Sequence, residues 1–508
     1  MSEQPDLLPD TEENRLLAGN VHPADWENPR PLGRYNLAVV GAGTAGLVCA
    51  AGAAALGAKV ALIERGFLGG DCLNVGCVPS KALLRAARAL FDARFGGRFG
   101  VVGAQGAKAD FGAAMERMRR LRGVLSGHDS ARRFRDELGV DVFFGAGRFT
   151  AADRIEVAGA GIAFAGAVVC TGARAEAPAV PGLAEAGYLT NETVFSLTEL
   201  PRRLAVVGGG PVGCELAQAF ARFGSRVTVI QRGERLLPRD DADASGVLLE
   251  AFGREGIEVL LGVKILAVKR RGTGKVLRLE RQGGESELEV DAILVGAGRS
   301  ANVEGLGLET AGIEYDRDGI KVNDLLRTSN PRVFAAGDVC ARYRFTHTAD
   351  AQARIVIANA LFRGRSRNSG LTVPWCTYTD PEIAHVGITP AEAAARGIGI
   401  ETLTVPFAEV DRAVLDGEEE GFARVYLKKG KDVILGATIV ARHAGEMIGE
   451  VTLAMNAGLG LAAIGRTIHP YPTQAEALRK LADLHRRRRL TPFVRKLLCA
   501  WLAWQRKR

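Results

Sequence analysis

Residues 35–64 read YNLAVVGAGTAGLVCAAGAAALGAKVALIE, and this stretch decides the fold. An apolar run leads into three closely spaced glycines, and an alanine-rich segment and a second apolar run follow. This order predicts a strand, a tight turn, a helix and a second strand. We expect Gly41 to make the turn, Gly43 to let a pyrophosphate approach the backbone, and Gly46 to allow close packing of helix on strand.

The pattern occurs a second time. The apolar run Leu204–Val207 precedes Gly208, Gly210 and Gly213, and the run Arg226–Gln231 follows. One such copy alone is weak evidence, but two copies in the same strand–helix context strongly indicate two dinucleotide sites. The helix behind each glycine loop would offer free N–H groups to the phosphates. Two sites on one chain suggest electron relay between two bound cofactors.

The two copies end on different residues. Glu64 lies eighteen residues after Gly46, and an acid there accepts hydrogen bonds from a ribose diol, as in FAD or NAD. Gln231 takes the same place in the second copy, and Arg232 beside it could pair with a 2′-phosphate. This favours NADPH over NADH at the second site. In the alternative interpretation, Arg232 is a solvated surface residue.

The most specific segment is 69–81, GGDCLNVGCVPSK. Cys72 and Cys77 have four residues between them beside a nucleotide unit, so they can close a disulfide. Zinc binding would need two more Cys or His ligands at suitable spacing, and none is nearby. The remaining alternative is a pair of buried free cysteines. No resident metal site is expected.

This segment resembles the active-site signature of the class I pyridine nucleotide–disulfide oxidoreductases, and the similarity covers roughly residues 35–485. Further family-like motifs follow in the expected order: Thr171-Gly172 and Gly296-Ala-Gly298-Arg299 at the two domain crossings, Ala335-Ala-Gly337-Asp338 as the second FAD motif, and Thr379-Asp-Pro-Glu382 at the start of the dimerisation domain. The resemblance implies an α/β fold with two Rossmann-like domains, for FAD and NAD(P), and an α+β dimerisation domain. It also implies a homodimer.

The resemblance sets the expected domain boundaries. These are an N-terminal extension at 1–34, an FAD-binding domain at 35–185 and 301–370, an NAD(P)-binding domain at 186–300, a dimerisation domain at 371–485, and a basic amphipathic tail at 486–508. Trp26 is expected to dock the extension onto the body.

The resemblance also assigns roles by position. Cys77 would form the charge-transfer thiolate beside the flavin, and Cys72 would be the interchange thiol that meets the substrate. Lys81 would lie by flavin N5 and pair with Glu215, because a buried ammonium needs a carboxylate partner. The expected cofactor-binding residues are Gly41, Gly43, Gly46, Glu64, Gly70, Lys81, Thr171, Gly172, Gly208, Gly210, Gly213, Gln231, Arg232, Gly298, Gly337 and Asp338.

Residues 469–476, HPYPTQAE, depart from the family pattern. Disulfide-reducing members carry a histidine where Tyr471 stands, and it serves as general acid from the partner subunit; Glu476 keeps its place. A tyrosine, with a usual pKa of about 10, is a poorer proton donor at neutral pH than a histidine near 6.5. Tyrosine here resembles the mercuric reductases, so the expected acceptor is a soft metal ion such as Hg(II), bound by Cys72 and Cys77.

Two alternatives to reduction of a soft metal ion stay open. The mercury-delivery cysteines of that branch are missing, since there is no N-terminal C-x-x-C domain and Cys499 stands alone near the C-terminus. His469 could replace the missing acid, which would make the protein a disulfide reductase of the dihydrolipoamide or glutathione kind. A low-turnover, membrane-associated flavoprotein is the third reading.

The charge is unevenly distributed. The net charge is +8, but residues 486–508 carry nine Lys or Arg and no acid, so the body is near neutral and gives no reason to expect nucleic-acid binding. The apolar stripe from Leu490 to Leu502 predicts an interfacial helix on an anionic membrane or a helix packed on its own dimer. Sparse cysteines and no recognisable signal peptide favour the cytoplasm, with the tail on the inner membrane face.

Overall fold

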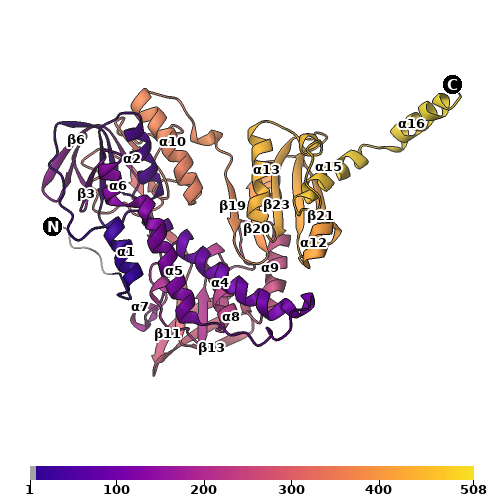
Figure 1. Cartoon of the computed structure of the whole chain (residues 1–508), viewed down its shortest axis with the longest axis horizontal. Coiled ribbons are helices and arrows are strands. Elements are labelled where there is room, and N and C mark those ends of the chain that lie inside the picture. Colours follow the sequence, from indigo (N-terminus) through magenta and orange to yellow (C-terminus); the bar gives the residue numbers. More distant parts are fainter. Residues whose placement is uncertain (1–6, 508) are drawn as a thin grey trace. The chain divides into compact units, whose positions relative to one another are not determined.

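The computed structural model of this chain describes residues 7–507, and the chain divides into two compact units (Figure 1). One unit runs to Glu234 and resumes at Glu255–Leu371. The other comprises Arg235–Arg254 together with the chain from Thr372 onward. Within the described residues, no helix is long and apolar enough to cross a bilayer.

The first nucleotide-binding sheet has seven strands, in the order β3-β2-β1-β6-β5-β4 with β18 also paired to β6. Its strands are β1 (Arg34–Val40), β2 (Val60–Glu64), β3 (Asp141–Phe144), β4 (Arg148–Ala151), β5 (Arg154–Val157), β6 (Ala160–Val169) and β18 (Val333–Ala335). Strands β3, β2, β1, β6 and β18 are parallel, whereas β5 pairs antiparallel with both β6 and β4. The predicted strand–helix–strand unit at 35–64 forms β1, α2 and β2, and layers on both faces explain its apolar strands.

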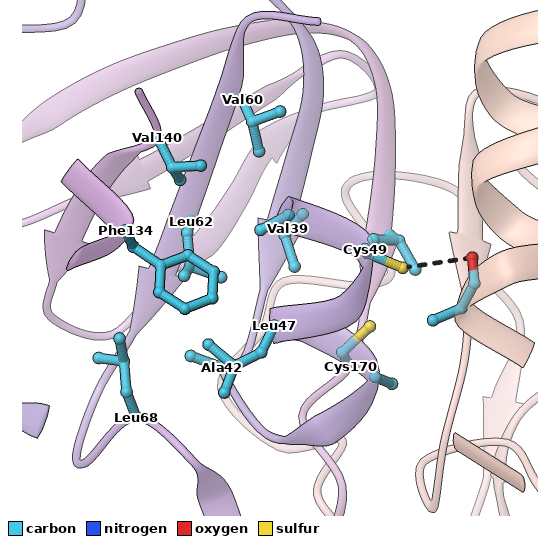
Figure 2. Packing of buried hydrophobic residues seen from close by; sticks show 14 of the residues in the cluster. Val39, Ala42, Leu47, Cys49, Val60, Leu62, Leu68, Phe134, Val140 and Cys170 are labelled. Atoms are coloured by element: carbon cyan, nitrogen blue, oxygen red, sulfur yellow. Dashed lines mark hydrogen bonds between the residues drawn. The ribbon is translucent and has the colours of Figure 1, made fainter. Parts of the chain in front are cut away.

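Two helices pack together over this sheet. Helix α2 (Thr44–Ala55) follows β1 and lies beside α10 (Thr346–Phe362) from much later in the sequence (Figure 1). Figure 2 shows the core beneath them, where Cys49 Sγ donates to the carbonyl of Ala353 at 3.8 Å. Other helices of this unit are α1 (Glu12–Val21), α3 (Gly70–Asn74), α4 (Cys77–Phe95), α5 (Phe111–Leu125), α6 (Ala131–Asp136) and α7 (Leu183–Ala186).

The second nucleotide-binding sheet repeats the same plan. Its strands run parallel in the order β10-β9-β8-β14, with α8 joining β8 to β9. The elements are β8 (Arg203–Val207), α8 (Pro211–Phe223), β9 (Arg226–Gln231), β10 (Glu258–Leu261) and β14 (Ala292–Val295). An antiparallel meander of β11 (Lys264–Arg271), β12 (Gly274–Arg281) and β13 (Gly284–Val290) follows β10. The predicted duplication is therefore confirmed.

The two chain segments at the predicted domain crossings pair with each other. Strand β7 (Ala173–Ala175) runs antiparallel to β15 (Arg299–Ala301). Beside them, Thr171 Oγ1 donates to the Asn302 carbonyl at 2.7 Å, and Asn302 Nδ2 donates to the Thr171 carbonyl at 2.9 Å. A short hairpin of β16 (Tyr315–Asp316) and β17 (Gly319–Ile320) lies between β15 and β18 in the sequence.

The C-terminal unit is an α+β layer. Its antiparallel sheet has the order β19-β20-β23-β22-β21. The elements are β19 (Pro374–Thr377), β20 (Glu382–Gly387), α11 (Pro390–Ala395), β21 (Ile400–Pro406), α12 (Asp411–Asp416), β22 (Phe422–Lys428), β23 (Ile434–Ala441), α13 (Ala444–Asn456), α14 (Leu461–Ile464), α15 (Glu476–Arg488) and α16 (Pro492–Gln505). Together with the two nucleotide sheets, this layer confirms the predicted fold class.

Helix α9 (Ala242–Arg254) groups with the C-terminal sheet, although the sequence places it inside the expected 186–300 domain. Two buried acids just before its start bond to residues of that sheet. Asp240 accepts from Trp375 Nε1 at 2.7 Å. Asp241 accepts from Arg424 Nη1 at 2.9 Å and from the Tyr426 hydroxyl.

The N-terminal extension is folded onto the first unit from residue 7 on. Trp26 is buried and its Nε1 donates to the Val142 carbonyl at 3.2 Å. Asn28 bonds to Phe144 twice, at 2.8 Å each, through its amide nitrogen and its amide oxygen. The extension thus pairs with edge strand β3, and Trp26 docks it as expected.

We expect Asp241→Ala to lower the free energy of unfolding by about 3 kcal/mol, because it leaves the partly buried Arg424 and the buried Tyr426 without their shared acceptor. Asp243→Ala is the matched control, since Asp243 also pairs with Arg424, at 2.8 Å, but is 65% exposed. That change should cost less than about 1 kcal/mol. Urea unfolding followed by tryptophan fluorescence measures both; equal, small losses would contradict the role of Asp241.

Candidate active site

The two cysteines of segment 69–81 lie on consecutive helices. Cys72 is in the short helix α3, and Cys77 is the first residue of α4. The bend between them needs Gly76, because a Cβ there would lie 2.7 Å from the Asp71 carbonyl oxygen. Both cysteines are free thiols, Cys72 partly buried and Cys77 exposed.

The pair is electrostatically polarised. A hydrogen bond from Cys72 is the largest influence on Cys77 and lowers the pKa of its thiol to about 6. Thr346 Oγ1, 3.4 Å from Cys77 Sγ, and the charge of Lys81 act in the same direction. The same hydrogen bond, together with burial, raises the pKa of the Cys72 thiol. Cys77 also begins α4, and a helix N-terminus favours a thiolate. Near neutral pH, Cys77 is therefore the thiolate and Cys72 the proton-bearing thiol.

Lys81 lies one helical turn after Cys77 on α4, and Glu215 lies on α8. The structure brings them together, with Lys81 Nζ 2.7 Å from Glu215 Oε2. The carboxylate is only 6% exposed, and a buried carboxylate is stabilised by such a cation. The pair holds a positive charge one turn from the Cys77 sulfur.

The first and third glycines of each loop are required by sterics. At Gly41 (φ +98°) an added Cβ would lie 2.5 Å from the Cys170 carbonyl oxygen, and at Gly208 (φ +109°) it would lie 2.6 Å from that of Gly296. At Gly46 and Gly213 a Cβ would come within 2.0 Å of the carbonyl oxygen of the first glycine of the same loop. Both loops therefore have the same tight geometry.

The middle glycines are different. A Cβ on Gly43 would find its nearest protein neighbour at 3.8 Å, and one on Gly210 would find none within 4 Å. Backbone open on one side at the start of a helix fits a phosphate-bearing dinucleotide. The residues present therefore fit FAD at the first loop and a nicotinamide nucleotide at the second.

The residues at the ends of β2 and β9 bond to their own glycine loops. Glu64 Oε2 accepts from the amide of Ala42 at 2.7 Å, and Gln231 Oε1 accepts from that of Gly209 at 2.9 Å. Burial raises the pKa of Glu64. Arg232, next to Gln231, is exposed.

Arg299 links three of the sequence motifs. Its guanidinium pairs with Asp71, the neighbour of Cys72, and lies 3.6 Å from Asp338 Oδ2. It also donates to the Ala173 carbonyl, in the first crossing, at 2.7 Å. Burial raises the pKa of Asp338. The sequence predicted Gly298 and Asp338 as site residues. It did not predict Asp71, Arg299 or Thr346. Arg299 could have been predicted, because it belongs to the second crossing motif.

Four more glycines were expected among the cofactor-binding residues. Gly70 has a φ of +54°, and a Cβ on it would lie 2.6 Å from the Cα of Gly43, so the redox segment sits directly on the first nucleotide loop. Gly337 has a φ of +78° and its amide donates to Gln352 Oε1 at 2.8 Å. Gly172 has a φ of +69°, whereas the nearest neighbour of a Cβ on Gly298 would be 3.8 Å away.

The remaining candidates lie in the C-terminal unit and do not bond to one another. The Tyr471 hydroxyl is exposed and donates to Asp411 Oδ2 at 2.9 Å, which raises the pKa of Tyr471. His469 places one ring nitrogen 3.1 Å from the Glu450 carboxylate and the other 3.2 Å from the Thr467 carbonyl. Glu476 is buried and pairs with Arg479.

Among residues 7–507 there is no cluster of three or more His, Cys, Asp or Glu that could hold a metal ion.

We expect Thr346→Val to raise the midpoint of the Cys77 thiol titration by roughly half to one pH unit, because it removes a hydrogen bond to the thiolate. The rate of iodoacetamide alkylation of the reduced protein, followed against pH, reports that midpoint. Thr348→Val on the same helix is the control, since the Thr348 hydroxyl is buried without a hydrogen-bond partner. Equal shifts in the two variants would contradict the contact.

Comparison with known proteins agrees with this geometry. Residues 35–353 match the pyridine nucleotide-disulphide oxidoreductase family, and residues 373–482 match its dimerisation domain, which supports a homodimer. The chain is 36% identical over 474 residues to a mercuric reductase of Streptomyces lividans, covering 92% of this chain and 98% of that protein. It is 35% identical over 470 residues to a dihydrolipoyl dehydrogenase of Thermus scotoductus, covering 89% and 98%.

A solved structure of a related flavoprotein has a similar fold. The HOCl-induced flavoprotein disulfide reductase RclA from Escherichia coli superposes with a TM-score of 0.79 at 28% identity, covering 89% of this chain and all of that one. The glycine loops, the polarised cysteine pair and these similarities converge on one conclusion: the chain belongs to the FAD- and NAD(P)H-dependent pyridine nucleotide–disulfide oxidoreductases.

Proposed function

We propose that this oxidoreductase takes electrons from NADPH and delivers them to a soft, thiolate-binding metal ion such as Hg(II). The observation that carries the proposal is Tyr471, a phenol bonded to Asp411 where disulfide-reducing relatives would need a histidine acid. The mercuric reductases among the similar proteins support it, and so does the Cu(II) complex solved for RclA, at a TM-score of 0.80 and 27% identity.

The cysteine pair suits a soft cation. Cys77 supplies a sulfur that is already anionic near neutral pH, and Cys72 supplies a second sulfur in hydrogen-bond contact with the first. Soft ions bind thiolates in preference to oxygen ligands. Binding through both sulfurs would release the Cys72 proton to solvent and cancel the charge of the two thiolates.

Proton supply separates the two candidate reactions. Reducing a disulfide requires protonation of a leaving thiolate, whereas Hg(II) takes up two electrons and leaves as the neutral atom without a proton. The raised pKa of Tyr471 makes it a weaker acid than a free phenol. The chemistry supplied by bound FAD would be uptake of a hydride from NADPH, which would become NADP⁺, and release of the electron pair toward the cysteines.

The side chains around the reaction would have distinct tasks. The Lys81 ammonium, fixed by Glu215, would stabilise negative charge beside the Cys77 sulfur. Arg299 would hold Asp71 and so orient the helix that carries Cys72. Arg232, exposed after the second loop, would pair with the 2′-phosphate of NADPH. Tyr471 of the partner subunit would approach the metal ion with its phenol oxygen and would not donate a proton.

The second candidate is reduction of a disulfide, as the names of RclA and the dihydrolipoyl dehydrogenases suggest for those proteins. It would require His469 or water to supply the proton. His469 is a weak candidate, because both of its ring nitrogens lie within 3.2 Å of acceptors on Glu450 and Thr467 and its side chain is only 6% exposed.

NADPH oxidation by the FAD-loaded protein tests the proposal, with Hg(II) in excess thiol set against glutathione disulfide and lipoamide. We expect fast turnover with Hg(II) alone, lost in Cys72→Ala and Cys77→Ala. Tyr471→His should raise disulfide turnover by about a hundredfold, the lower range for a general acid, while Tyr471→Phe should not. Fast disulfide turnover by the unmodified protein would reject the metal-ion proposal.

A separate proposal concerns helix α16, which we infer to lie on an anionic membrane surface at the cytoplasmic face. Its fourteen residues span about 21 Å, short of the roughly 30 Å hydrocarbon core, so it would lie flat rather than cross. Phe493, Leu497 and Trp501 are 73%, 61% and 54% exposed. Four arginines at 486–489 precede the helix, and such basic groups are attracted to anionic lipids.

Sedimentation with vesicles checks this. We expect the full chain to pellet with phosphatidylglycerol vesicles and to remain in solution with phosphatidylcholine vesicles. Leu497→Glu with Trp501→Glu, or truncation after Arg489, should abolish pelleting without changing NADPH oxidation. Equal pelleting of the truncated protein would reject the membrane role, and a change of oligomeric state on truncation would assign the helix to the dimer instead.

A further inference from the structure

The N-terminal extension contacts the redox segment at residues other than the two cysteines. We propose that this extension is a working part of the redox centre, with Asn14 and Arg122 as positioning residues that set the geometry and charge of the Cys72–Cys77 pair. The inference rests on the family's dithiol chemistry and is independent of which acceptor receives the electrons.

A buried arginine connects the extension to the segment between the cysteines. Arg122, on α5, is 2% exposed. Its Nη1 donates to the carbonyl of Asn74 at 2.6 Å, and its Nη2 donates to Asn14 Oδ1 on α1 at 2.7 Å. Asn14 is equally buried, and its Nδ2 donates to the Pro9 carbonyl at 2.8 Å. The carbonyl two residues after Cys72 is thus held by a cation whose position is fixed by the extension.

The held residue in turn organises the segment before Cys72. Asn74 Nδ2 donates to the carbonyls of Leu68 and Gly70, at 3.0 and 2.9 Å. Asn74 is therefore bonded on both its backbone and its side chain, so a shift at Arg122 would be passed on to the turn that leads into Cys72.

The extension also fixes the start of that turn. His22 Nδ1 lies 2.8 Å from the Gly66 carbonyl, and the Leu68 amide donates to the Val21 carbonyl at 3.1 Å. The His22 ring stacks on Phe144 with centroids 4.0 Å apart. Residues 66–74 are thus held at one end by backbone and ring contacts and at the other end by Arg122.

The electrostatics give Arg122 an influence beyond geometry. The two oxygens that accept its hydrogen bonds are neutral, an amide and a carbonyl. Burial lowers the pKa of Arg122 to about 10, so it keeps its charge at neutral pH. Under this proposal, Arg122 acts on the sulfur pair through the Asn74 carbonyl, and its buried charge adds to that of Lys81 in favouring a thiolate.

Asn14→Asp tests the proposal because it keeps an oxygen for Arg122 but adds a negative charge. We expect the midpoint of Cys77 alkylation against pH, in the reduced holoenzyme, to rise by roughly half to one unit. Flavin reduction by NADPH should be unchanged, because hydride arrival does not involve this region. Asn14→Ala should slow electron transfer to any acceptor by about tenfold, with flavin reduction again unchanged.

Asn20→Ala is the matched control. Asn20 lies on the same helix and donates to Ser126 Oγ at 2.8 Å instead of to Arg122, so the variant reports the cost of loosening α1 alone. It should leave the alkylation midpoint in place. The proposal is overturned if Asn14→Asp leaves the midpoint unchanged, or if Asn14→Asp and Asn20→Ala shift it alike. Failure of the metal-ion acceptor would appear separately, as turnover with disulfides and not with Hg(II).

Discussion

The structure depends on one close approach, between the first nucleotide loop and the redox segment. Gly41 brings the loop against the end of β6, and Gly70 then packs its backbone onto Gly43, at a distance that leaves no room for a Cβ. Because of this contact, the helix that carries Cys72 starts at the loop that would bind the FAD pyrophosphate. Cofactor and disulfide are thereby placed by the same few residues, and any side chain at 41 or 70 would separate them.

Around that contact, charge is arranged so that the two sulfurs differ. Cys77 has a threonine hydroxyl and the Cys72 thiol in contact with it and the Lys81 charge one helical turn away, while Cys72 is less exposed and keeps its proton. Arg299 holds the segment through Asp71, and Arg122 holds it through the Asn74 carbonyl. An asymmetric dithiol of this kind can meet a soft ion with one sulfur ready and the second following by loss of a proton.

The sequence was informative where a function requires local geometry. The two glycine patterns predict the nucleotide loops, because each pattern depends on spacing within a few residues. The Lys81–Glu215 pair joins two helices and was expected only from the resemblance to the family. The other long-range partners were not predictable. Nothing in the residues near Asn14 or Asp71 indicates that they meet Arg122 and Arg299, since hydrophobic periodicity shows which face is buried but not which distant element covers it. The grouping of α9 with the C-terminal sheet was missed for the same reason, because Asp240 and Asp241 look like surface acids in the sequence.

The central claim is that electrons from the nicotinamide nucleotide arrive at Cys72 and Cys77. The most direct measurement counts accessible thiols in the oxidised, FAD-loaded protein, under denaturing conditions, before and after anaerobic addition of one equivalent of NADPH. The account predicts a gain of two thiols per chain, absent in Cys72→Ser. A bleached flavin with no gain in thiols would contradict it, because the electrons would then leave the flavin by a route that bypasses the pair.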